Sequence, residues 1–205
     1  MMPPESPAPA TVYYLVSGAT TAWRAREIVP GLLALFDRAL TIPTPNAARV
    51  ISVYDLARIP GNLVIESYLD SQLRPRPVPA PVVFAPCSFN SLNKLAHGIA
   101  DNLALSIASE MMGLGQPILV AVSVNEGLWA HPQCRASISA LQSWGVTVVE
   151  PRATSGGLSL APTDELLAKI KQMMQAHQGM TTDQQGPTHA PDKQIAPQQS
   201  SQRAV

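Results

Sequence analysis

The chain has 205 residues, and its 14 basic and 14 acidic residues cancel to no formal net charge at pH 7. Because no basic stripe stands out, nucleic acid is not an expected partner. No apolar run is long enough to span a membrane, and residues 1–10 lack the apolar core of a signal peptide, so a cytoplasmic protein is expected. Two cysteines, Cys87 and Cys134, are too few for a disulfide framework and match no metal-ligand spacing, so no metal site is expected.

Both ends of the chain differ in composition from its middle. Residues 1–10 are rich in proline, and residues 179–205 are rich in Gln, Thr, Ser and Pro with almost no large apolar side chain. Such segments bury too little apolar surface to offset the entropy lost on ordering, so both are predicted to be disordered tails. One domain is therefore expected over residues 11–178. Only 14% of all residues are charged while 46% are apolar, which favours an oligomer that covers apolar surface.

Short apolar segments alternate with helical patterns along this domain. Strands are expected over residues 12–16, just before Pro43, and over residues 82–85, 118–124 and 146–149. Helices are expected over residues 21–40 with an interruption at Pro30, over residues 91–112 and 132–144, and from Thr163 onward. Apolar strands separated by helices predict a parallel sheet that is covered on both faces. The expected fold class is therefore α/β, a three-layer doubly wound parallel sheet of the Rossmann-like or flavodoxin-like kind.

In such sheets, ligands bind in the loops that follow the strands. The first loop, Ser17-Gly18-Ala19-Thr20, stands between a strand and a helix, where free N–H groups favour an anion such as phosphate. The third loop, residues 86–91, carries small hydroxyl and amide side chains and leads into a helix. Helix capping alone also accounts for both loops, so the patterns by themselves leave the two interpretations open.

Residues 86–102 read Pro-Cys-Ser-Phe-Asn-Ser and then Leu-Asn-Lys-Leu-Ala-His-Gly-Ile-Ala-Asp-Asn. They resemble the Pro-Ala-(Ser/Thr)-Ala-Asn-Thr motif, with its trailing Lys-Leu-Ala-His-Gly-Ile-Ala-Asp, of the flavoprotein family that includes the homo-oligomeric cysteine decarboxylases. The Thr-Pro-Asn run from Thr44 resembles the family's second loop, and Val-Ser-Val-Asn-Glu-Gly-Leu-Trp over residues 122–129 resembles Pro-x-Met-Asn-x-x-Met-Trp. The resemblance covers residues 11–160 and looks closest to actinobacterial-type flavoproteins that share Phe-Asn and Asn-Lys in the third loop.

The resemblance implies FMN as the cofactor, bound where the subunits of a trimer meet. The cofactor-binding residues that it implies are Ser17, Gly18, Ala19, Thr20, Thr44, Cys87, Ser88, Phe89, Asn90, Ser91, Ala121 and Ser123. Among them, Asn90 and Ser91 would approach the ribityl chain or the ring. Asn125 matches the family's asparagine that binds the substrate carboxylate. Asp101 is either a contact of the site or a residue that fixes its helix.

The sequence departs from the family's chemistry in three places. The decarboxylases oxidise a cysteine thiol at the flavin and require a histidine shortly before the third strand, but the family's spacing leads here to Gln72, and no histidine precedes His97. A neutral amide cannot take a proton near pH 7, so Gln72 cannot act as the base. In the family's Pro-x-Met-Asn-x-x-Met-Trp motif, which clamps the substrate, the proline is replaced here by Val122 and the methionines by Val124 and Leu128. Residues 156–161 lack the late cysteine of the phosphopantothenoylcysteine enzymes. His97 and His131 are expected to be structural.

Four functions remain open at this point. The first is an FMN-dependent enzyme with altered chemistry that acts on a small acid or a peptide. The second is a non-catalytic or half-site subunit that forms a hetero-oligomer with a histidine-bearing homologue. The third is a flavin prenyltransferase-like protein, for which Arg49 and Arg152 would supply basic groups. The fourth is a domain that has lost its cofactor, against which the hydroxyl and amide side chains of the loops argue.

Overall fold

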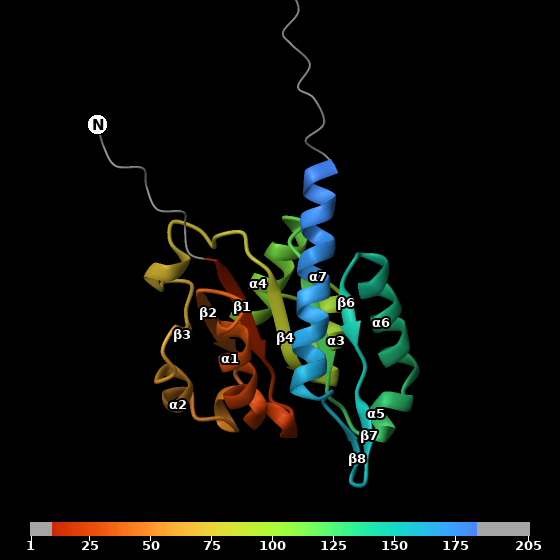
Figure 1. The fold of residues 1–205 in the computed structure, drawn as a ribbon. Helices are drawn as coiled ribbons and strands as arrows, with labels where there is room; N and C mark the ends of the chain where they lie inside the picture. Colours follow the sequence, from red (N-terminus) through yellow and green to blue (C-terminus); the bar gives the residue numbers. More distant parts are fainter. Residues whose placement is uncertain (1–9, 184–205) are drawn as a thin grey trace, which may run out of the picture.

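The computed structural model describes residues 10–183, in which a parallel sheet of six strands has helices on both faces (Figure 1). The strand order is β3-β2-β1-β4-β5-β6, and every neighbouring pair is parallel. The expected doubly wound α/β fold is therefore confirmed. The six strands are β1 (Thr11–Val16), β2 (Arg38–Pro43), β3 (Asn62–Val64), β4 (Val82–Cys87), β5 (Ile118–Val122) and β6 (Thr147–Val149).

The helices divide into two layers (Figure 1). One face of the sheet is covered by α1 (Ala25–Leu33), α2 (Val53–Ala57) and α7 (Thr163–Asp183). The other face is covered by α3 (Phe89–Ala96), α4 (Leu103–Gly113) and α6 (Pro132–Ser143). Because both faces are covered, every residue of β1, β4 and β5 is buried, as the continuous apolar runs predict.

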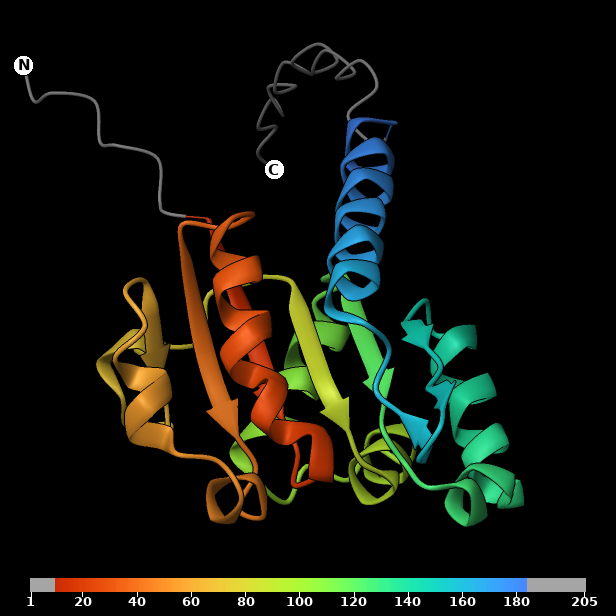
Figure 2. The same cartoon turned by 60° about the horizontal axis from the view of Figure 1, so that its bottom comes forward.

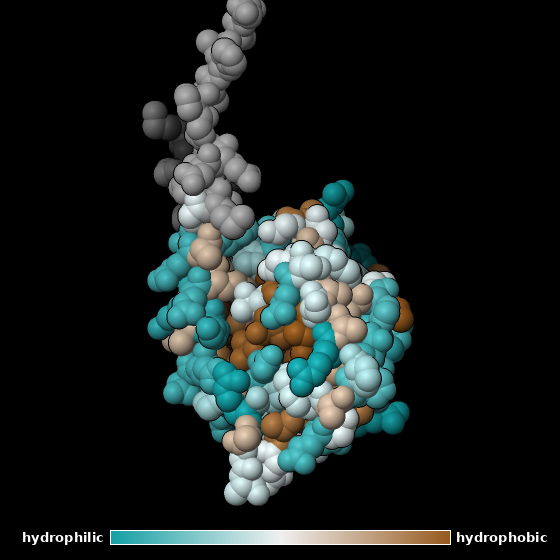
Figure 3. Space-filling view, turned by 90° about the vertical axis from the view of Figure 1, so that its right-hand side faces the viewer, coloured by the Kyte–Doolittle hydropathy of each residue, from teal (hydrophilic) through white to brown (hydrophobic). Residues whose placement is uncertain are grey.

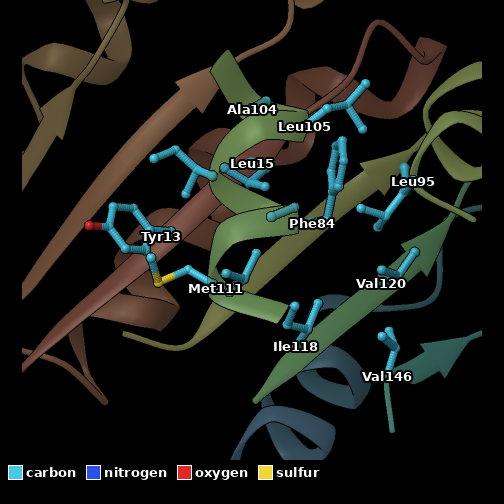
Figure 4. Packing of buried hydrophobic residues seen from close by; sticks show 14 of the residues in the cluster. Tyr13, Leu15, Phe84, Leu95, Ala104, Leu105, Met111, Ile118, Val120 and Val146 are labelled. Atoms are coloured by element: carbon cyan, nitrogen blue, oxygen red, sulfur yellow. The ribbon is translucent and has the colours of Figure 1, made fainter. Parts of the chain in front are cut away.

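Alternate residues of β1 point into two separate hydrophobic clusters. Tyr13 and Leu15 belong to the cluster under α3, α4 and α6, whereas Tyr14 belongs to the cluster under α1 and α7. Figure 4 shows the first cluster, in which Leu105 and Met111 of α4 lie over the central strands. Burial raises the pKa of Tyr13 to about 12, so its hydroxyl stays protonated and donates to the carbonyl of Val78 at 3.0 Å.

The single helix expected over residues 91–112 is wrong, because the structure has two helices there. Helix α3 ends in a glycine turn: Gly98 has φ +66°, its N–H donates to Leu95 O at 3.1 Å, and Ile99 N–H donates to Lys94 O at 2.9 Å. This pair of bonds is the Schellman arrangement, for which a left-handed glycine is suited. Asn102 then begins α4 by accepting a hydrogen bond from Leu105 N at 3.2 Å. The apolar periodicity runs through both helices and hides the break.

Several other elements differ from the predicted ones. The segment expected as one helix over residues 21–40 is a 3-10 turn η1 (Thr20–Arg24), then α1 with Pro30 inside it, and finally the start of β2. Helix α5 (Glu126–Ala130) and the antiparallel hairpin of β7 (Arg152–Thr154) and β8 (Gly157–Ser159) were not predicted. Helix α7 continues to Asp183, five residues beyond the expected domain boundary at 178. The remainder of the two expected tails, residues 1–9 and 184–205, lies outside the described residues.

The short strands β3 and β6 form the two edges of the sheet. Val148 of β6 is only half-buried. Figure 3 looks onto the β6 side of the molecule, where apolar residues gather in a hollow area between polar ones. An edge strand of three residues offers few free backbone groups to another chain. Over residues 10–183, no helix combines the length and the apolar character that a membrane crossing requires.

Replacing Tyr14 by Phe is expected to leave the free energy of unfolding unchanged or to raise it by about 1 kcal/mol. The reason is that the buried Tyr14 hydroxyl has no hydrogen-bond partner within the described chain. Tyr13→Phe is the matched control, since it removes the bond to Val78 and is expected to cost roughly 0.5–1.5 kcal/mol. Urea denaturation followed by circular dichroism measures both variants. A greater loss of unfolding free energy for Tyr14→Phe than for Tyr13→Phe would show that the Tyr14 hydroxyl has a hydrogen-bond partner in solution.

Candidate functional site

Because all six strands are parallel, their carboxyl ends meet at one edge of the sheet, and the loops that follow them gather there (Figure 2). The first and second loops touch directly beside Gly18. A Cβ atom at Gly18 would lie 2.8 Å from the backbone carbon and the Cβ of Asn46, a distance that side chains do not adopt. The second loop is joined to β1 as well, through Thr44 N–H to Val16 O at 2.8 Å. Only glycine therefore permits this approach of the two loops.

Ser17 joins the first loop to the third. Its Oγ donates to Pro86 O at 2.8 Å and accepts from Ser88 N at 2.7 Å, and the residue is almost completely buried. The backbone N–H of Ser17 also donates to Pro86 O at 3.0 Å. Both capacities of the hydroxyl are thus used within the protein. Its role in the structure is to set the distance between two loops.

The third loop opens into α3, whose first turn carries small polar side chains. Ser88 begins the helix, and its Oγ lies 3.5 Å from Ser91 N and 3.3 Å from Ser91 Oγ. Asn90 is exposed on the same turn. The first N–H groups of a helix lack internal acceptors and carry the positive end of the helix dipole, which suits an anion.

These loops enclose a polar hollow of about 190 Å³, which we call the Ser88 hollow. Its lining consists of Gly18, Thr44, Pro45, Asn46, Ser88, Asn90, Ser91, Lys94, Asp101 and Asn102. This volume is below the range of about 300–1,000 Å³ that encloses a drug-sized ligand. The hollow therefore suits the phosphate group of a ligand and the few atoms next to it. A ring system attached to that phosphate would extend over the open surface.

The only two charged residues that line the Ser88 hollow, Lys94 and Asp101, form an ion pair with each other. The hydrogen bond from Lys94 holds the pKa of the exposed Asp101 carboxyl below its ordinary value. Because the pair is neutral overall, an anion would be held here by hydroxyl, amide and backbone N–H donors. A phosphate ester fits such a set of donors.

Five of the twelve predicted cofactor residues line this hollow: Gly18, Thr44, Ser88, Asn90 and Ser91. The other seven lie outside its lining, and several have clear structural roles. Cys87 and Ala121 are fully buried and point into opposite hydrophobic clusters, and burial strongly raises the pKa of the Cys87 thiol. Phe89 packs edge-on against the His131 ring, with 5.3 Å between the ring centroids. The remaining residues are Ser17, described above, and Ala19, Thr20 and Ser123 on neighbouring loops.

The list of implied cofactor residues leaves out half of this lining. Asp101, for which the sequence left a site contact open, lies in the lining, and Pro45, Asn46, Lys94 and Asn102 also face the hollow. Asn102 begins a second helix that the sequence analysis did not separate, and the turn at Gly98 brings this helix start next to the third loop. A glycine followed four residues later by a capping asparagine is the signal that could have revealed it.

Asn125 lies in a second hollow, which we call the hairpin hollow. It has a volume of about 650 Å³ and is lined by Asn125, Glu126, Gly127, Gly156, Gly157 and Leu158. The Asn125 Oδ1 accepts from Leu128 N at 2.9 Å and so begins α5, while no partner is recorded for its Nδ2 within residues 10–183. Ser123 N–H donates to Cys87 O at 2.9 Å, which places the start of this hollow next to the third loop.

The segment η1, which directly follows the first loop, reaches residues next to the hairpin hollow. Thr21 Oγ1 lies 2.7 Å from Ser123 Oγ, two residues before Asn125. Arg24 donates to Leu160 O at 2.9 Å and to Ala161 O at 2.8 Å, directly after β8. Side chains of η1 thus fix the position of the first loop relative to the segments that flank the hairpin hollow.

None of the three histidines within residues 10–183, His97, His131 and His177, lines either hollow. His131 Nδ1 accepts from Gln133 N at 3.0 Å and begins α6, and His97 Nε2 lies 3.1 Å from Gln133 Nε2. Gln72, the position that the family's spacing reaches, accepts from Arg38 at the start of β2, the end of that strand remote from the loops. Among residues 10–183, no group of three metal-ligating side chains comes together.

Comparison with known proteins agrees with this arrangement. A family model described as Flavoprotein matches residues 4–176. The chain is 26% identical over 172 residues to a probable phosphopantothenoylcysteine decarboxylase of Streptococcus mutans, with 78% of this chain and 96% of that protein covered. It is 24% identical over 201 residues to phosphopantothenoylcysteine decarboxylase of Mus musculus, with 86% and 97% covered.

Solved structures share the fold at lower identity. A PPC decarboxylase mutant complexed with pantothenoylaminoethenethiol superimposes with a TM-score of 0.70 at 18% identity, over 82% of this chain and all of that chain. The FMN binding protein AtHal3 gives a TM-score of 0.69 at 18% identity, over 82% and 97% of the two chains. Peptidyl-cysteine decarboxylase EpiD gives 0.66 at 18% identity, over 78% and 96%.

Gly18→Ala is expected to lower the free energy of unfolding by about 1–3 kcal/mol, because the new methyl group would force the first and second loops apart. Gly113→Ala is the matched control. It lies at the end of α4, and a Cβ there meets no atom within 4 Å, so its stability is expected to equal or slightly exceed that of the unmodified chain. Chemical denaturation compares the two. Equal stability of both variants would contradict the close approach at Gly18.

Proposed function

The chain belongs to the Flavoprotein family and has FMN as its cofactor, and on this premise we propose that it is an FMN-dependent, decarboxylase-like enzyme for a small carboxylate-bearing molecule or peptide. The observation that carries the proposal is the Ser88 hollow, where hydroxyl, amide and backbone N–H donors from three loops converge beside a glycine that lets the first two loops approach each other. The hairpin hollow next to it provides a place for a substrate. A cofactor site beside a substrate site is the arrangement that a flavin enzyme requires.

Each part of the site has a separate task in this proposal. The hydroxyl groups of Thr44, Ser88 and Ser91 and the first N–H groups of α3 hold the FMN phosphate, and Asn90 approaches the ribityl chain or the ring. Bound FMN supplies a two-electron acceptor for oxidation of the substrate. Asn125 binds the substrate carboxylate through its Nδ2, since its Oδ1 is already used to begin α5.

The chemistry differs from that of the cysteine decarboxylases in its proton transfers. Gln72 cannot accept a proton. His131 accepts a hydrogen bond at the start of α6, and His97 contacts the side chain of Gln133 on that helix. Residues 156–161 contain no thiol that could donate a proton late in the reaction. We therefore assign to this chain the binding and orientation of a carboxylate at the flavin, with any base supplied by the substrate, solvent or a second chain.

A trimer or higher oligomer is part of the proposal. The Ser88 hollow is too small to enclose a whole flavin, so the ring would lie on open surface unless another subunit covers it. Exposed Trp23 and Tyr54 on neighbouring segments are the kind of large side chains that such contacts bury.

Purified protein is expected to be yellow and to release about one FMN per chain. Asn90→Ala is expected to weaken FMN binding by about 3- to 10-fold, the effect of losing one hydrogen bond. Gln142→Ala, an exposed amide on α6 away from both hollows, is the matched control and should bind FMN normally. Titration of the FMN-free chain, followed by quenching of flavin fluorescence, measures both. A colourless protein that takes up no added FMN would overturn the proposal.

A second function is favoured by one specific observation: Gln72 and the three histidines within residues 10–183 lie outside the two hollows. We propose as the alternative that this chain is a half-site subunit, which contributes Asn125 to a site whose histidine comes from a homologue. Such a chain would release no CO₂ from a cysteine-ended peptide when it is alone.

Complementation tests the half-site function. The partner is a histidine-bearing homologue whose own clamp asparagine has been replaced, so that it is inactive by itself. Mixing the two chains is expected to form a hetero-oligomer and to restore CO₂ release, measured by mass spectrometry of the peptide, whereas Asn125→Ala in this chain should prevent the restoration. Failure of the two chains to associate would reject this alternative.

A further inference from the structure

The hairpin hollow contains one charged side chain whose role the proposed function does not use. Its walls are the first turn of α5 on one side and the tip of the β7–β8 hairpin on the other. Glu126 is the only ionisable residue among the six that line it. The other five are an amide, three glycines and a leucine, so the charge of the hollow is that of Glu126 alone.

The Glu126 carboxylate points across the hollow toward the hairpin. A Cβ atom placed on Gly157 would lie 3.6 Å from Glu126 Oε1, closer to it than to any other atom outside the neighbouring residues. Gly156 and Gly157 carry no side chains that could fill the remaining space. The carboxylate therefore faces an open volume that a ligand group can enter.

Within residues 10–183, no cationic side chain pairs with this carboxylate. The ion pairs found within residues 10–183 do not include Glu126. Arg152 stands on the same hairpin, but its guanidinium is bonded to Glu165 and to the carbonyl of Glu150. An unpaired carboxylate in a concave site attracts a cationic group and repels a second anion.

The neighbouring side chains match a ligand that carries both charges. Asn125 presents a free amide donor for a carboxylate, and Glu126 stands directly after it. Leu158 is half-buried and offers an apolar surface for the methylene stem of a lysine or an arginine.

We propose that Glu126 determines substrate specificity: it selects a substrate with a cationic side chain next to the carboxylate that Asn125 binds, and it rejects a substrate with a second negative charge there. This inference rests on the proposed function, because Asn125 must first bind a carboxylate. Attraction of one charge and repulsion of the other both contribute to the selectivity.

The test uses the FMN-loaded full chain and three acetylated tripeptides with free carboxyl ends, acetyl-Ala-Lys-Cys, acetyl-Ala-Gln-Cys and acetyl-Ala-Glu-Cys. Isothermal titration calorimetry gives the three dissociation constants. The Lys peptide is expected to bind about 2- to 5-fold more tightly than the Gln peptide, and the Glu peptide more weakly, as for an exposed charge pair. Glu126→Gln is expected to make the three constants equal, and 0.5 M salt is expected to reduce their differences.

Two further variants make the result specific. Glu66→Gln removes an exposed carboxylate that lies outside the hairpin hollow, and it should keep the preference for the Lys peptide. Asn125→Asp keeps an oxygen that can accept the hydrogen bond from Leu128 N at the start of α5, but it loses the amide donor. It should therefore weaken the binding of all three peptides.

The outcomes separate this inference from the proposed function. Equal binding of the three peptides by the unmodified chain, or a Lys preference that survives Glu126→Gln, overturns the role of Glu126 while carboxylate binding stands. Binding that is unaffected by Asn125→Asp, or no binding of any peptide, overturns the proposed substrate site and the specificity role with it.

Discussion

The hydroxyl group of Ser17 is the contact on which the geometry of the site depends. It receives the backbone N–H of Ser88 and donates to the carbonyl of Pro86, so it fixes the end of β1 against the end of β4. Those two strands occupy the centre of the sheet, and the loops after them form two walls of the Ser88 hollow. The third wall, at Asn46, reaches the first only because Gly18 has no side chain. Two small residues thus control how three loops meet.

The same loop region also relates the cofactor site to the substrate site. Thr21 contacts Ser123, and Arg24 binds the backbone immediately after the hairpin and the side chain of Thr163 at 2.7 Å. These contacts join the start of the first helical segment to residues that lie just before one wall of the hairpin hollow and just after the other. A change in the conformation of this segment would therefore be transmitted to the proposed substrate site through hydrogen bonds between neighbouring parts.

The chain combines a well-formed cofactor cradle with an incomplete set of proton-transfer groups. His131 and His97 stabilise helix α6 and its contact with α3, and both cysteines are buried within the domain. What the hollows do offer is recognition: donors for a phosphate, an amide for a carboxylate and an unpaired carboxylate for a cation. This division is the basis of the proposal that the chain binds FMN and a carboxylate with a specificity different from that of its decarboxylase relatives.

The amino-acid sequence by itself determined the fold class, because continuous apolar strands and alternating helices leave few arrangements other than a covered parallel sheet. It also identified the first, second and third loops, since Gly18, Thr44 and Ser88 follow directly from strand ends. The break between α3 and α4 escaped it because one apolar period runs through both helices. Only the tertiary structure decided that Lys94 and Asp101 neutralise each other, that Cys87 and Ala121 face the core, and that Glu126 stands opposite the glycines of the hairpin. These relations join residues far apart in the chain or depend on the direction of a single side chain, and local patterns carry no information about either.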